Sequence, residues 1–147
     1  MSRRRGFTLL EVVIALLIGS ILTSIALSGF GNARGRYAVR GARSTFASLL
    51  ARTRAQAIEA GGRMILFVDV AGDSAFIWNG QNLETIRFDE ELKVDLASEQ
   101  GSFRICMNAR GFADTGCNSF WSETRLYFRH NADTASVRIL PLGQLVY

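Results

Sequence analysis

An uninterrupted apolar run near the N-terminus constrains this chain more than any other feature. Glu11 is followed by the nineteen residues 12–30, VVIALLIGSILTSIALSGF, which include no charged side chain. As an α-helix, a run of this length extends about 28 Å, close to the roughly 30 Å hydrocarbon thickness of a bilayer. The sequence therefore predicts a transmembrane helix here.

The charges around this run predict its orientation. Arg3, Arg4 and Arg5 precede it, and basic residues beside a span are retained on the cytoplasmic side of the membrane. We therefore expect a cytoplasmic N-terminus and an external remainder. Glu11 is unusual, because an ionisable group in a membrane helix costs about 2.5–3.5 kcal/mol and is rare without a partner. A function is indicated for this carboxylate.

The residues RGFTLLE at positions 5–11 resemble the signal of type IV prepilins and type II secretion pseudopilins. In that family a prepilin peptidase cuts after the glycine and methylates the new terminal amine. The resemblance implies a leader peptide over residues 1–6, cleavage between Gly6 and Phe7, and N-methylation of Phe7. It also implies that Glu11 pairs with the amine of a neighbouring subunit, which would offset two unfavourable burials in lipid. A plain signal anchor with a chance glutamate is the alternative.

The charge that remains after the leader is segregated along the chain. The whole sequence has a net charge of +4, but fourteen basic and thirteen acidic residues remain without residues 1–6. Residues 34–63 contain seven arginines and one acid, whereas residues 64–147 contain seven basic and eleven acidic residues. This pattern favours either contact between the basic part of one subunit and the acidic head of the next, or a solvated helix face near anionic lipid.

The middle of the chain predicts a helix that continues from the transmembrane and assembly helix (7–30) into an amphipathic stalk (31–62). Glycines weaken a helix by about 1 kcal/mol each, so we expect a flexible zone around four of them. These are Gly29, Gly31, Gly35 and Gly41. Farther along, apolar residues recur at three- and four-residue steps, as on a helix face that packs against a sheet. They are Val39, Ala42, Phe46, Leu49, Leu50, Ala57 and Ile58. Gly61 and Gly62 predict the end of the helix.

The periodicity then changes to two, which predicts a β-rich periplasmic head over residues 63–147. Strands are expected at 64–70, 75–78, 83–88, 92–97, 103–107, 124–129 and 135–140. Asn79-Gly80 and residues 130–133 predict tight turns, and Pro141 ends the final long strand. The predicted fold class is α+β and pilin-like, with a long N-terminal helix packed on one antiparallel sheet or a pair of them.

Cys106 and Cys117 are the only cysteines. The topology above places them in an oxidising compartment, so a disulfide is predicted, worth about 3 kcal/mol in the chain-entropy model.

No enzyme, metal site or cofactor is predicted. The lone His130 lies in an expected turn without a nucleophile or carboxylate partner, and is expected to be solvated. Asp89, Glu90 and Glu91 are expected to face solvent in a turn before a strand, and calcium would need further oxygen ligands.

Within the pilin family the chain resembles the GspH/FimT group, through FRICMNARGF at 103–112 and the C-terminal segment ending in PLGQLVY. Some FimT-like minor pilins take part in DNA uptake through a Gly-Arg-x-Arg pattern, but here the matching residues are Gly143, Gln144, Leu145 and Val146. Nonspecific phosphate contacts are instead assigned to Arg34, Arg36, Arg40 and Arg43, with base stacking as the alternative to core packing for four aromatics. These are Phe112, Phe120, Trp121 and Tyr127.

The sequence thus predicts a minor pilin or pseudopilin, a structural subunit of a type II secretion pseudopilus or a type IV pilus, with a DNA receptor as the alternative. Expected partners are other pilin subunits, the prepilin peptidase, inner-membrane lipid and the inner-membrane assembly platform.

Overall fold

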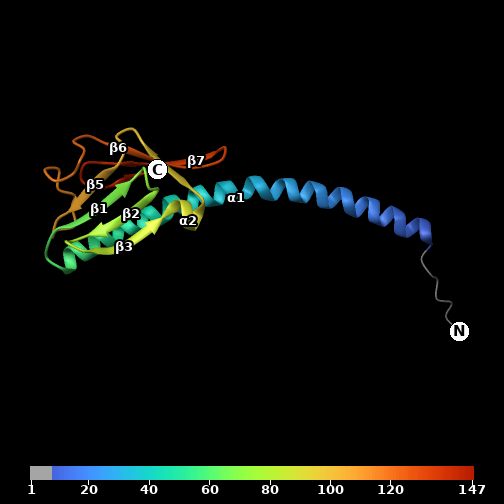
Figure 1. The fold of residues 1–147 in the computed structure, drawn as a ribbon, viewed down its shortest axis with the longest axis horizontal. Helices are drawn as coiled ribbons and strands as arrows, with labels where there is room; N and C mark the ends of the chain where they lie inside the picture. Colours follow the sequence, from blue (N-terminus) through green and yellow to red (C-terminus); the bar gives the residue numbers. More distant parts are fainter. Residues whose placement is uncertain (1–7) are drawn as a thin grey trace. The chain divides into compact units, whose positions relative to one another are not determined.

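The computed structural model describes residues 8–147, apart from the side chains of residues 26–33. The chain divides into two compact units, Met1–Arg34 and Gly35–Tyr147, and helix α1 (Leu9–Glu59) contributes to both (Figure 1).

The first unit contains the N-terminal part of α1. Every described side chain from Leu9 to Ile25 is exposed, and Leu9 reaches 83%. No helix that lies within the described residues is long and apolar enough to cross a membrane. The predicted span at 7–30 also includes Phe7 and the side chains of residues 26–30, which fall outside the described part of the chain.

In the second unit, α1 buries one face against the sheets. Val39, Ala42, Phe46, Leu49, Leu50 and Ala57 are at most 3% exposed, which confirms most of the predicted apolar face. Ile58 was expected there but is 53% exposed. It lies one residue before the end of the helix and contacts the Gly111 region instead. Gly61 adopts φ +58° just beyond α1, the left-handed conformation that commonly ends a helix.

Two four-stranded antiparallel sheets complete this unit. The first has the order β3 (Asn82–Arg87), β2 (Ser74–Trp78), β1 (Met64–Asp69), β5 (Phe103–Met107). The second has the order β4 (Asp95–Ser98), β6 (Thr124–His130), β7 (Asp133–Ile139), β8 (Leu145–Val146). Side chains alternate between buried and half-buried along β1, as expected when one face of a sheet covers a core. The α+β fold class with an antiparallel head is therefore confirmed, and the number of sheets is two.

Aromatic contacts join the helix to the second sheet. The ring of Phe128 on β6 lies 6.1 Å from that of Phe46 on α1 and 5.9 Å from that of Phe88, and all three side chains are fully buried. These three rings form one buried cluster, and aromatic pairs at this separation add to the free energy of burial.

A short helix, α2 (Phe88–Leu92), takes the place of the predicted turn at Asp89–Glu91 and of the ends of both flanking strands. Phe88 is 0% exposed, and its N–H donates to the Asp73 carbonyl at 2.8 Å. Lys93 ends the helix in a left-handed conformation with φ +57°. Burial of Phe88 therefore determines this segment, and the acidic residues of the first turn suit its positive end.

Candidate functional site

The first candidate site is the N-terminal motif. Gly6 and Phe7 lie outside the described residues, so their cleavage and methylation stay predictions. Glu11 lies in the first turn of α1, and its backbone N–H donates to the Thr8 hydroxyl oxygen at 3.3 Å. Threonine before a helix with glutamate three residues later is the spacing of a capping box. Sequence reasoning missed this role of Thr8, although the T-x-x-E spacing signals it.

The second candidate site is the loop closed by the cysteines. Cys106 and Cys117 form a disulfide with a Cα–Cα distance of 5.8 Å. Directly after the loop, the Asn118 side chain accepts a hydrogen bond from the Cys106 N–H at 2.9 Å and donates one to the Pro141 carbonyl at 3.0 Å. The Asp114 N–H donates to the Cys106 carbonyl at 2.8 Å. The disulfide loop is thus attached to both β5 and the C-terminal segment.

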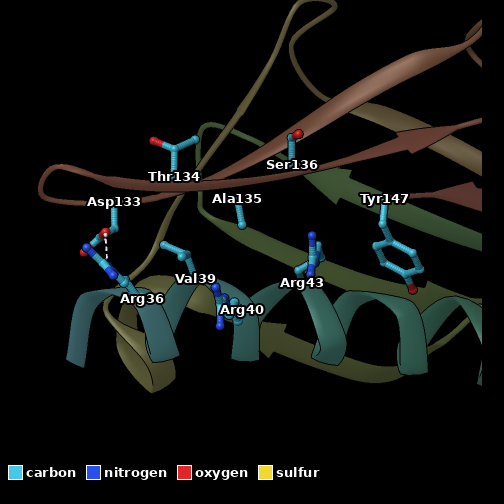
Figure 2. Close-up of a pocket in the computed structure, with 9 residues that line it drawn as sticks. All are labelled: Arg36, Val39, Arg40, Arg43, Asp133, Thr134, Ala135, Ser136 and Tyr147. Carbon is cyan, nitrogen blue, oxygen red and sulfur yellow. Dashed lines mark ion pairs between the residues drawn. The ribbon is translucent and has the colours of Figure 1, made fainter. Parts of the chain in front are cut away.

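The third candidate site is a groove of about 660 Å³ between α1 and β7, called the arginine groove from here on. Its residues are Arg36, Val39, Arg40, Arg43, Asp133, Thr134, Ala135, Ser136 and Tyr147. Figure 2 shows the helix as one wall, residues 133–136 of β7 as the facing wall, and the Tyr147 ring near Arg43.

Three guanidinium groups follow one side of the helix in this groove. Arg36, Arg40 and Arg43 are four and three residues apart, a spacing that places helical side chains on one face. The Arg36 Nε lies 3.7 Å from a carboxylate oxygen of Asp133, and the Arg43 guanidinium carbon lies 4.9 Å from the centre of the Tyr147 ring. Within the described part of the chain, Arg40 has no ion-pair partner. The groove therefore presents three positive charges against one carboxylate.

Gly35 brings the second wall close to the helix. It is buried in the part of α1 that faces the β6–β7 turn, and an added Cβ would overlap the Asp133 carboxylate. The same Cβ would lie 3.3 Å from the His130 ring. The absence of a side chain at Gly35 thus permits the turn to pack on the helix, which aligns β7 with the arginines.

Comparison with known proteins finds matches to the N-terminal motif and to the fold. Residues 1–27 match the family model described as the prokaryotic N-terminal methylation motif. The fold matches the crystal structure of the type IV minor pilin FimU of Pseudomonas aeruginosa strain PAO1, with a TM-score of 0.57 and 11% identity over 74% of this chain and 86% of that one. No curated protein matches the sequence. The chain therefore carries an N-terminal methylation motif and has a pilin-like fold.

The structure brings together only part of the residue set predicted for nucleic acid. Arg36, Arg40 and Arg43 meet in the arginine groove, whereas Arg34 belongs to the first unit. Sequence reasoning missed Tyr147 and the β7 wall. A strand and a helix separated by about ninety residues give no local signal that they face one another.

None of the four aromatic residues predicted to stack on bases lines this groove. Phe120 is a core residue at 2% exposure and Tyr127 is half-buried, while Phe112 and Trp121 are 54% and 84% exposed.

His130 was predicted to be a solvated turn residue, and that prediction is wrong. Its side chain is half-buried, and Nδ1 lies within hydrogen-bonding distance of the Lys93 carbonyl oxygen. The β6–β7 turn packs against α1 and thereby covers the ring.

Proposed function

We propose that this chain is a minor pilin or pseudopilin of the GspH/FimT type, a structural subunit rather than an enzyme. It is made as a prepilin, cut between Gly6 and Phe7 and methylated on Phe7. Helix 7–30 holds it in the inner membrane with the head in the periplasm, until it enters a type II secretion pseudopilus or a type IV pilus. The observation that carries this proposal is the presence of a prepilin motif and a pilin fold in one chain.

Glu11 gives the proposal its assembly step. A carboxylate and an ammonium are each unfavourable in lipid, and both penalties fall when they meet between packed helices. Glu11 lies in the first turn of α1, where its backbone is held by the Thr8 cap. Glu11 follows by four residues the new N-terminus that cleavage after Gly6 would create.

Mass spectrometry of the protein extracted from membranes tests the processing. We expect a chain that begins at Phe7 and carries one added methyl group. A chain that retains residues 1–6, or that has lost the apolar run, would refute the proposal.

Substitution of Glu11 tests the assembly step. Glu11→Ala should leave membrane insertion intact and reduce incorporation into filaments, as measured in sheared filament fractions. Glu59→Ala is the matched control, because Glu59 is an exposed carboxylate at the other end of α1. Equal incorporation of the two variants would exclude this role for Glu11. A strain lacking the protein separates the two filament types, since loss of secreted enzymes indicates a pseudopilus and loss of pilus-dependent motility indicates a pilus.

A DNA receptor is the second candidate function. The arginine groove supports it by placing three arginines beside an exposed tyrosine, a combination that suits phosphates and a stacked base. Binding of the full chain in detergent to a single-stranded oligonucleotide should then weaken steeply with salt. An affinity unaffected by Arg40→Gln would remove the groove from this function.

A further inference from the structure

We propose that the arginine groove is the docking site for an acidic segment on the head of an adjacent pilin-like subunit. The proposal rests on the proposed function, because it names the contact that a subunit of a filament would make through this surface.

The groove is built to receive carboxylates. Planar guanidinium groups bind carboxylates through paired hydrogen bonds, and the groove holds three of them. Arg36 already faces one carboxylate, since its Nε lies 3.7 Å from an oxygen of Asp133. Arg40 and Arg43 retain donors for an incoming ligand, since Arg40 has no ion-pair partner among the described residues and Arg43 stacks on Tyr147.

The extent of the groove indicates a short segment. Arg36 and Arg43 are seven residues apart on α1, which corresponds to a rise of about 10 Å. The side chains of Asp133 and Ala135 point from the other wall toward the helix, so the hydrogen-bond donors of the groove are its guanidinium groups (Figure 2). Two carboxylates separated by one or two residues match this distance.

The charges around the groove favour a carboxylate segment over a nucleic acid. Asp133 lies on the β7 wall, and it would repel a continuous phosphate backbone that ran along the groove. Residues 64–147, which form both sheets, carry eleven acidic and seven basic side chains. A long polyanion would extend beyond the groove and be repelled by this acidic head, whereas a segment of a few residues would stay within the groove.

The head of this chain shows that such a head can carry a segment with the required chemistry. In this chain α2 presents Asp89, Glu90 and Glu91 within one helical turn, and all three are exposed. Glu90 contacts Arg87 at 2.6 Å across an exposed pair, which a stronger partner can replace at little cost. A segment of this composition on the adjacent subunit would complement the three arginines.

In-cell photo-crosslinking tests the contact. A benzoylphenylalanine in place of Tyr147 lies in the groove and keeps all three arginines, and the same residue at Ser48 lies on an exposed part of α1 outside the groove. We expect the probe at position 147 to form an adduct with an acid-rich head segment of a pilin-like protein, mapped by mass spectrometry, and the Ser48 probe not to do so. The double variant Arg40→Gln/Arg43→Gln should reduce that adduct about tenfold, the effect of losing two partly exposed ion pairs. Arg110→Gln, an exposed arginine outside the groove, should leave it unchanged.

Three outcomes would overturn the inference. They are an adduct of the probe at position 147 with nucleic acid, an adduct with a segment lacking acidic residues, and no protein adduct in cells whose filaments contain the protein. Filament content is measured separately by immunoblot of sheared filaments. A protein that is absent from filaments would contradict the proposed function itself, whereas normal incorporation without the adduct contradicts only the docking site.

Discussion

Two glycines in the same helix should respond in opposite ways to alanine. An alanine is more favourable than glycine in a helix interior by about 0.8–1.0 kcal/mol. At Gly41 an added Cβ would meet no heavy atom within 4 Å, so Gly41→Ala should gain that free energy of unfolding in full. At Gly35 the same atom would overlap the Asp133 carboxylate and lie 3.3 Å from the His130 ring. Relief of this overlap requires Asp133 to leave Arg36 or the β6–β7 turn to move.

The free-energy cost of the overlap is obtained by comparing the stabilities of Gly35→Ala and Gly41→Ala. The gain in helix propensity is common to both, so their difference in stability equals the cost of the overlap, typically about 1–3 kcal/mol for an overpacked site. For a unit of about 110 residues this corresponds to a Tm difference of roughly 4–12 °C. Differential scanning calorimetry of the full chain in detergent measures it.

A second substitution isolates the cause. Asp133→Ala alone removes an exposed ion pair and should cost less than about 1 kcal/mol. The double variant Gly35→Ala/Asp133→Ala removes most of the overlap, so it should be more stable than Gly35→Ala. An equal Tm for Gly35→Ala and Gly41→Ala would refute the predicted overlap at Gly35. A double variant less stable than Gly35→Ala would refute it as well.

Three further predictions concern the same unit. Replacement of Cys106 and Cys117 by serine should lower the free energy of unfolding by about 3 kcal/mol in urea titrations, and a reductant should have the same effect on the wild-type chain. Phe46→Ala should cost about 3–5 kcal/mol by the same titration, because its ring is fully buried in the core. Burial raises the pKa of Asp73 more than the hydrogen bond from the Leu96 N–H lowers it. The native state therefore binds the carboxyl proton more tightly than the unfolded chain does. Its contribution to stability therefore falls as the pH rises from the ordinary carboxyl pKa through the raised one, and its ionised form is unfavourable at neutral pH. Asp73→Asn keeps an acceptor for the Leu96 N–H, and asparagine tolerates the left-handed backbone at φ +43°. This variant should be at least as stable as the wild-type chain at pH 7, and its free energy of unfolding should change less between pH 4 and 7.

The helix and most strands could be predicted because their signal is local. The apolar residues of α1 recur at the helical period, and the residues that β1 and β6 bury recur at every second position, so the period indicates the type of each element. The α2 segment gave no such signal, since five residues are too few for a period. Its helix depends on burial of Phe88 and on a hydrogen bond to Asp73, both of which are tertiary.

Gly35 is a second position whose role depends on a tertiary contact. In the sequence it counts as one of four glycines that weaken a helix, and a flexible zone was predicted around it. In the structure α1 is continuous there, and Gly35 is the position at which the β6–β7 turn approaches the helix. A close approach between residues about a hundred positions apart is invisible to local periodicity.

Only one wall of the arginine groove could be predicted for a similar reason. The spacing of Arg36, Arg40 and Arg43 follows from the sequence, but the facing residues of β7 and Tyr147 depend on how the second sheet packs on α1.

The division of α1 into a buried face and a charged face allows contact and stability to be tested separately. The Arg36 side chain is 70% exposed, whereas Phe46, on the adjoining face of the same helix, is fully buried. Substitution of a groove arginine removes no core contact, so a filament defect in Arg40→Gln with an unchanged Tm would report a lost contact with another subunit. Gly35→Ala differs from Arg40→Gln, because it both moves the wall of the groove and destabilises the fold. A filament defect in Gly35→Ala that exceeds the defect of a core variant of equal Tm would therefore measure the contribution of groove geometry to assembly.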